Sequence, residues 1–267
     1  MRYSVLVLGS FLLGVPLSMS SAAAQERDAP SGEPGSQGPL PSAATETPAV
    51  AYAHSAFGVS AGTVGAAGYG ESRGEFRSST PNFGGGLRIW ISPLDRLTLF
   101  ADAERRDEGS NRRFAPSASA QLRIVGDRKV GWALSALARY KAEGFAELGG
   151  EVEFAVLGSY ARRGLHLDGN VIVGAGFEEG ESDGELLARA GYDVLPFLRI
   201  GGEGRARQRL SGDASLPGGR SWDAYAGPQV LGYSGAFFGA LTAGPSTVGI
   251  QGGLGWLALL TVGGAAF

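Results

Sequence analysis

The stretch Ala146–Phe177 constrains the fold of this chain more than any other, because apolar and polar residues alternate along it. On its second arm an apolar residue or glycine occupies every second position, while His166, Asp168 and Asn170 lie between them. A period of two is typical of a strand with one apolar and one polar face. The stretch therefore predicts a hairpin of two long strands, with its tight turn at residues 160–164.

The same alternation recurs along most of the chain, and links rich in Gly, Pro or charged residues separate the repeats. We expect short turns after every even-numbered strand and longer polar links, such as Glu71–Asn82 and Arg106–Arg113, after the odd ones. An antiparallel up-and-down β-barrel of about twelve strands is predicted, with ten or fourteen as alternatives. Besides the two arms of the hairpin, the expected strands are Ala51–Tyr69, Gly84–Ser92, Arg96–Arg105, Ser117–Ile124, Val130–Lys141, Gly184–Asp193, Phe197–Gln208, Trp222–Gly232, Ala236–Ala243 and Val248–Leu260.

The first fifty residues are not expected to belong to the barrel. Arg2, the apolar run Val5–Leu17 and the small residues Ala22–Ala24 form the three regions of a cleavable signal peptide over residues 1–24. Residues 25–50 are rich in Pro, Gly and Ser and have few residues to bury, which predicts a disordered leader. The barrel is expected over residues 51–267.

Composition excludes several other classes of protein. With no Cys, the chain forms neither disulfides nor thiolate metal sites. Its formal net charge of −3 is too small to favour nucleic-acid binding. Many of its 45 glycines lie inside the periodic runs, which argues against helices. After the signal peptide no run of eighteen apolar residues predicts a transmembrane helix.

The distribution of charge favours a membrane barrel over a soluble one. Along each expected strand, charged residues occupy alternate positions, which we call the polar parity, and the positions between them are nearly free of charge. A charge that faces lipid costs about 2–4 kcal/mol at the bilayer midplane, so such strict exclusion is what a lipid-facing surface requires. Aromatic residues such as Trp132, Tyr140, Tyr192 and Trp222 also lie at or near strand ends, as in the aromatic girdles of membrane barrels.

These features together resemble the bacterial outer-membrane β-barrel class: a signal peptide, alternating strands from Gly84 to Leu260, aromatic strand ends and a C-terminal Phe267. The resemblance implies a location in the outer membrane of a Gram-negative bacterium. It also implies two partners, outer-membrane lipid and the barrel assembly machinery that reads a last strand ending in an aromatic residue. Residues Gly263–Ala266 depart from the class, since they lack large alternating apolar residues, and the last strand is therefore expected to end near Val262.

The polar parity is predicted to line the lumen as charge-neutralised networks. The row of His166, Asp168 and Asn170 could form a metal or acid–base cluster, but a hydrogen-bonded polar rung is the favoured interpretation. Glu147, Glu151 and Glu153 are likewise expected to pair with arginines rather than to act as catalytic acids and bases. No catalytic, metal or cofactor site is predicted. The residues expected to line the lumen are Arg88, Asp102, Glu104, Arg123, Arg139, Glu147, Glu151, Glu153, His166, Asp168, Asn170, Arg189, Arg199, Glu203, Arg205 and Arg207.

The function favoured by the sequence is that of a narrow pore for small hydrophilic solutes with a charge-balanced lumen. Three alternatives stay open at this point: a non-conducting structural or surface-binding barrel, an outer-membrane lipid hydrolase, and a soluble exported ligand-binding barrel.

Overall fold

The computed structural model describes residues 49–50, 53–76, 81–108, 111–126, 130–142, 150–177, 181–211, 222–247 and 254–266. All regular structure in these ranges is β-strand. In the same ranges no helix is long and apolar enough to cross a membrane. The expected signal peptide and most of the expected leader, like Phe267, lie outside the described residues.

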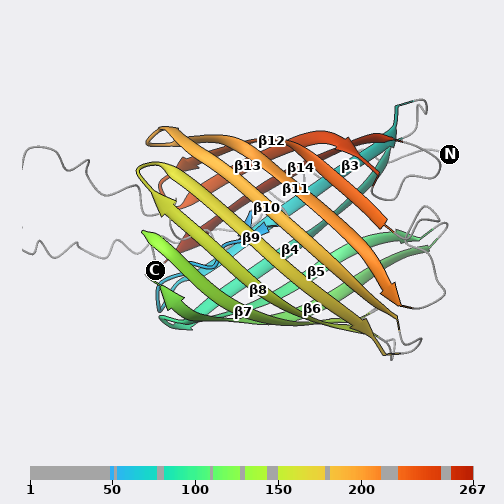
Figure 1. The fold of residues 1–267 in the computed structure, drawn as a ribbon, viewed down its shortest axis with the longest axis horizontal. Coiled ribbons are helices and arrows are strands. Elements are labelled where there is room, and N and C mark those ends of the chain that lie inside the picture. Colours follow the sequence, from blue (N-terminus) through green and yellow to red (C-terminus); the bar gives the residue numbers. More distant parts are fainter. Residues whose placement is uncertain are drawn as a thin grey trace, which may run out of the picture. The chain divides into compact units, whose positions relative to one another are not determined.

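Twelve antiparallel strands form a closed barrel, in which each strand pairs with the next along the chain and β14 pairs with β3 (Figure 1). The predicted all-β fold and the predicted strand number are therefore confirmed. A two-stranded hairpin, β1 (Ala49–Val50) with β2 (Ala53–His54), is separate from the wall. The strands of the wall are β3 (Val64–Glu75), β4 (Asn82–Leu94), β5 (Leu97–Glu108), β6 (Asn111–Gly126), β7 (Gly131–Ala142), β8 (Gly150–Arg162), β9 (Leu165–Gly176), β10 (Ser182–Leu195), β11 (Leu198–Ser211), β12 (Trp222–Ser234), β13 (Phe237–Ser246) and β14 (Gly255–Ala266).

The period of two in the sequence corresponds to the two faces of the wall. On β8, Phe154 and Val156 are 64% and 54% exposed, whereas their neighbours Ala155 and Leu157 are buried. Since successive side chains of a strand point to opposite faces, one face of β8 turns outward and the other faces the interior. Large apolar side chains thus cover the outside of the barrel, where a soluble protein of this size would place polar ones.

The turn between β8 and β9 consists of Arg163 and Gly164 alone. Both have positive φ, 50° and 82° respectively. Two successive residues of positive φ are typical of the type I′ turn, whose twist matches that of the strands it joins. The tight turn predicted at residues 160–164 is therefore present, shortened to its last two residues.

The first predicted strand is wrong in its position. Residues from His54 to Thr63 are not part of any wall strand, and the strand expected over Ala51–Tyr69 begins only at Val64. Period-two spacing of Phe57 and Val59 suggested a wall strand, but these residues are buried inside the barrel. The physical reason is that this segment carries no Lys, Arg, Asp or Glu, so residues 54–57 can be enclosed inside the barrel.

The predicted end of the last strand is also wrong, and the loop predicted over Arg106–Arg113 is mostly strand. β14 continues past Val262, and Ala266 is the Cα partner of Val64. Its small residues fit close packing: a Cβ on Gly263 would lie 2.7 Å from the Phe238 ring. The charged loop expected over Arg106–Arg113 is mostly part of β5 and β6, which remain paired out to Glu108 and Asn111.

The interior is packed with apolar side chains around the segment before β3. One cluster joins Ala56 and Phe57 to residues of β7–β10, among them Leu157 and Leu187. A second cluster joins Val59 to Trp90, Phe100 and other buried residues of the strands on either side of the β14–β3 closure, namely Ala67, Leu231, Tyr233, Phe238 and Ala240. The interior core therefore has residues 56–59 at its centre.

Candidate functional site

Residues 54–63, which we call the inner segment, pass through the barrel interior from its middle to the end that carries the short turns. His54 contacts Asn170, the sixth residue of β9, whereas Gly62 contacts Ser92 beside the β4–β5 turn. The segment is buried from His54 to Phe57, and His54, the last residue of β2, contacts Phe100 of β5, Arg139 of β7 and Asn170 of β9. Any solute that crosses the lumen must pass this segment, so we treat it with the surrounding wall as the candidate site.

The amide of Asn170 holds the main chain of His54 by two hydrogen bonds. The His54 N–H donates to Asn170 Oδ1 at 3.0 Å, and Asn170 Nδ2 donates to the His54 carbonyl at 2.9 Å. Asn170 is 1% exposed. Since a buried peptide group without a partner is costly, this pair stabilises the innermost end of the segment.

Further wall side chains bind the main chain of the next residues. The Ala56 N–H donates to Ser159 Oγ at 2.7 Å, and its carbonyl accepts from Ser135 Oγ at 2.7 Å. The Ser55 carbonyl accepts from Gln121 Nε2 at 2.8 Å, and the Phe57 carbonyl accepts from Arg123 Nη1 at 2.8 Å. Side chains of β6, β7 and β8 thus take the place of a neighbouring strand.

The other end of the inner segment is fixed to the β4–β5 turn. The Gly62 N–H donates to the Ser92 carbonyl at 2.7 Å, and the Ser92 N–H donates to the Thr63 carbonyl at 2.9 Å. The Ala61 N–H donates to Asp95 Oδ1 at 3.1 Å. Gly62 has a φ of 85°, which favours glycine, so the chain can turn there into β3.

His54 is surrounded by cations and an aromatic ring. Its Nε2 lies 2.9 Å from Arg139 Nη2, and its ring meets the Phe100 ring edge-to-face at 5.6 Å between centroids. Burial lowers the pKa of His54 well below its usual value, and the nearby guanidinium groups of Arg88, Arg139 and Arg189 lower it further. The held imidazole is therefore neutral, with Nε2 as the acceptor for Arg139.

Charged side chains of opposite sign pair across neighbouring wall strands. The Asp168 carboxylate accepts from Arg189 at 2.9 and 2.6 Å and from Ser159 Oγ at 2.5 Å. Between β10 and β11, Asp193 binds Arg199 at 2.7 Å. Further pairs among the described wall residues are Arg88 with Asp102, Arg139 and Lys141 with Glu153, Glu185 with Arg205, and Asp183 with Arg207.

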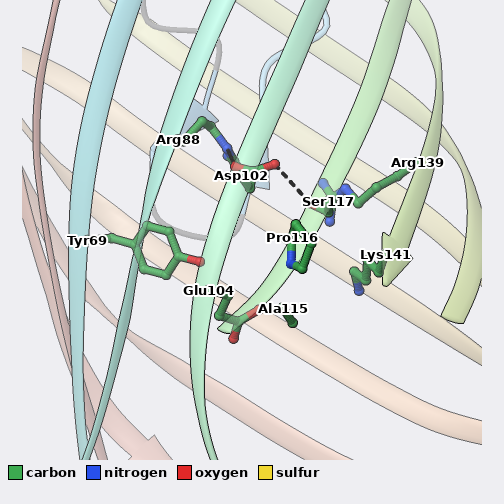
Figure 2. Close-up of a pocket in the computed structure, with 9 residues that line it drawn as sticks. All are labelled: Tyr69, Arg88, Asp102, Glu104, Ala115, Pro116, Ser117, Arg139 and Lys141. Atoms are coloured by element: carbon green, nitrogen blue, oxygen red, sulfur yellow. Dashed lines mark hydrogen bonds and ion pairs between the residues drawn. The ribbon is translucent and has the colours of Figure 1, made fainter. Parts of the chain in front are cut away.

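A small polar hollow lies between the charged groups of β4–β5 and those of β7 (Figure 2), and one of its lining residues, Arg139, also contacts His54. It arises because β6 contributes only Ala115, Pro116 and Ser117 between longer neighbours. Its volume is about 40 Å³, enough for a few water molecules. Its other lining residues are Tyr69, Arg88, Asp102, Glu104, Arg139 and Lys141.

The residues predicted to line the lumen occupy several separate places on the wall. Asp168, Arg189, Arg199, Asp102 and Glu153 are buried in the pairs described above. Arg123 and Asn170 bind the inner segment, Arg88, Glu104 and Arg139 line the hollow, and Glu203 accepts from Gln229 Nε2 at 3.2 Å. Glu151 lies 3.9 Å from Lys141, Arg205 and Arg207 pair with Glu185 and Asp183, and Glu147 lies outside the described residues.

The row of His166, Asp168 and Asn170 does not act as one cluster. His166 Nε2 lies 2.8 Å from Asp193, Asp168 binds Arg189, and Asn170 binds the inner segment. Within the described ranges no group of three His, Asp or Glu side chains is arranged to hold a metal ion.

The inner segment is the part of the site that sequence reasoning missed, together with three neutral wall residues that bind it: Gln121, Ser135 and Ser159. Neutral residues on a polar parity look alike in a sequence, whether they meet water or a peptide group. The one available indication was the absence of Lys, Arg, Asp and Glu between Ala53 and Thr63, which most of the expected strands do contain; only Ala236–Ala243 and Val248–Leu260 also lack them.

Comparison with known proteins supports the architecture. No protein-family model and no curated protein sequence matches the chain. Among solved structures, a NanC porin in a rhombohedral crystal form matches with a TM-score of 0.58 and 8% identity, covering 74% of this chain and 98% of that one. A bacterial polysaccharide outer membrane secretin matches with a TM-score of 0.44 and 7% identity, covering 76% and 98%. The chain therefore has the twelve-stranded fold of the outer-membrane β-barrel class.

Proposed function

We propose that the chain is an integral outer-membrane β-barrel that serves as a narrow pore for small hydrophilic solutes. The observation that carries this proposal is the reversed distribution of side chains over a closed barrel. Outward residues such as Ile89, Val156 and Leu186 are 57%, 54% and 55% exposed, whereas the charged pairs are on the inside. Lipid on one face and water on the other is the environment that such a wall requires.

Aromatic side chains near the strand ends support a position across a bilayer. Trp132, Tyr192, Trp222 and Phe237 are each more than half exposed and lie within three residues of a strand end. Amphipathic rings favour the level of the lipid headgroups. The same exposed rings and aliphatic residues disfavour the soluble exported barrel, which would bury its apolar face.

The wall favours solutes without a strong net charge. Each charged pair described above joins an acid to a base on a neighbouring strand, so the two signs largely cancel along the lumen. A pore with such a lumen is expected to discriminate weakly between cations and anions. The porin named in the structural comparison agrees with a pore, although at 8% identity only the fold is shared.

A second candidate, a barrel that does not conduct, is favoured by one observation: Ala56, Phe57 and Val59 fill the interior with apolar contacts. Nothing favours a lipid hydrolase. Such an enzyme needs an exposed nucleophile and base on the lipid side, whereas His54 and His166 both point inward and contact charged residues.

The route to the membrane forms part of the same proposal. Residues 1–24 would direct export and be cleaved near Ala24, residues 25–50 would form the leader, and the assembly machinery of a Gram-negative bacterium would insert the barrel. Mass spectrometry of the protein purified from outer membranes tests the cleavage, since the mature chain should begin at Gln25.

Recording from planar bilayers tests the pore. The refolded mature chain should give discrete conductance steps, with a reversal potential near zero in a tenfold KCl gradient. If a correctly folded, membrane-inserted chain gives no steps, the pore is wrong and the non-conducting barrel replaces it.

A further inference from the structure

The wall recognises the inner segment through its main chain. Asn170, Ser159, Ser135, Gln121 and Arg123 all bind peptide N–H or carbonyl groups of residues 54–57. These five side chains come from four different strands, β6 to β9. Together they form a binding site for the main chain of a short peptide, in which residues 54–57 are all buried and Ala56 is 0% exposed.

The inner segment is suited to leave this site. It contains no Lys, Arg, Asp or Glu, so its departure separates no ion pair. Its residues are small apart from His54, Phe57 and Val59. The wall groups that would lose their partners are hydroxyl, amide and guanidinium groups. Water can form hydrogen bonds with all of them once it enters the lumen.

The anchor at the short-turn end defines where such a movement would pivot. Gly58 and Gly62 have positive φ, at 66° and 85°. Beyond Gly62 the chain is fixed to Ser92 and continues into β3. A rotation about Gly62 would carry His54 away from Asn170 and would leave the twelve wall strands in register.

We propose that the inner segment is a gate in cis: the lumen holds a binding site for the main chain of a short peptide, and residues 54–57 occupy and close it. Exit of these residues opens the path along the charged pairs of the wall. This inference rests on the proposed pore, whose regulation it describes.

A reversible cross-link tests the gate. Ser55 Oγ lies 3.4 Å from Ser159 Oγ, and the chain has no native Cys, so Ser55→Cys with Ser159→Cys introduces a single possible disulfide. In planar bilayers the oxidised double variant should spend at least tenfold less time open than the same protein after reduction. Each single variant serves as its own control: its open time should be the same after oxidation and after reduction, because it cannot form the cross-link. Equal opening of the oxidised and reduced forms would overturn the gate.

Labelling of the single Ser55→Cys variant separates failure of the gate from failure of the pore. If residues 54–57 leave their site, a small charged thiol reagent should label Cys in the folded protein within minutes. Labelling without any conductance would show that the segment leaves its site and would contradict the proposed pore. Absence of labelling in a folded barrel would overturn the gate, whether or not the barrel conducts.

A second variant keeps the test independent of the cross-link. Asn170→Ala removes both bonds to His54 and should raise the open time and the labelling rate severalfold. Val171→Ala, its outward neighbour on β9, is the matched control and should change neither. Equal effects of the two variants would contradict the proposed site.

Discussion

Asp168 and Arg189 form the most enclosed ion pair of the described wall, with side chains 5% and 7% exposed. Asp168→Asn keeps the shape and leaves the Arg189 charge buried without its partner. Because an uncompensated buried charge is costly, the free energy of unfolding should fall by about 3–5 kcal/mol. Urea titration in lipid vesicles measures it. The double variant Asp168→Asn with Arg189→Met removes both charges and should recover most of the loss; no recovery would mean that the penalty does not come from the charge.

His54 makes the held state of the inner segment sensitive to pH. A released His54 titrates near its usual pKa of about 6.5, whereas the held one, whose pKa is lowered by burial and by Arg88, Arg139 and Arg189, stays neutral. As the pH falls below about 6.5, protons bind only the released form, so the held state loses stability until the lower pKa is reached. Above about pH 6.5, His54 is neutral in both the held and the released form, so its protonation no longer changes the stability of the held state.

Amide hydrogen exchange of residues 54–57, corrected for intrinsic rates, measures this dependence. Exchange should be faster at pH 5.5 than at pH 7.5, and most carboxylates remain ionised over that range. His54→Gln should abolish the difference. If exchange in the unsubstituted chain is the same at both pH values, His54 does not control the segment.

At the scale of the element, the β8–β9 hairpin depends on its two-residue turn. Gly164 has a φ of 82°, so Gly164→Ala introduces a Cβ into the left-handed region and should destabilise the barrel by about 1 kcal/mol. Gly169→Ala in the same hairpin is the control: a Cβ there meets no atom within 4 Å, and the φ is not positive. Urea midpoints compare the two. A larger loss from Gly169→Ala would contradict the importance of the turn.

How far the sequence predicts each element follows from what packs against it. Strands such as β8 and β9, with lipid on one side and the lumen on the other, show strict alternation and were predicted with their turn. The inner segment is enclosed by wall side chains and has no lipid on either side, so its pattern carries no orientation. The end of β14 was missed because Gly263 and Gly264 lie so close to Phe238 and Phe237 that larger side chains would clash there. A local sequence pattern does not show such contacts.

For the whole molecule, the sequence predicts the wall better than its contents. Closure, strand number and the two faces all follow from one repeated period. The partners of Asn170 or Ser159 depend instead on a segment that lies 116 and 103 residues away in the chain, within a closed ring. Contacts across such separations depend on how the closed barrel encloses the segment and not on local alternation, so they leave no periodic pattern in the sequence.

The position of the whole barrel in a bilayer makes a prediction that depends on depth. Val156, in the middle of β8, and Leu195, at the end of β10, both face outward and are 54% and 46% exposed. Val156→Arg should lower the free energy of unfolding in lipid vesicles by about 2–4 kcal/mol, since it places a charge near the midplane. Leu195→Arg should cost about 0–1 kcal/mol, because its guanidinium reaches the headgroups. Similar penalties for both variants would mean that these two positions are at the same depth, and the proposed orientation of the strands across the bilayer would fail.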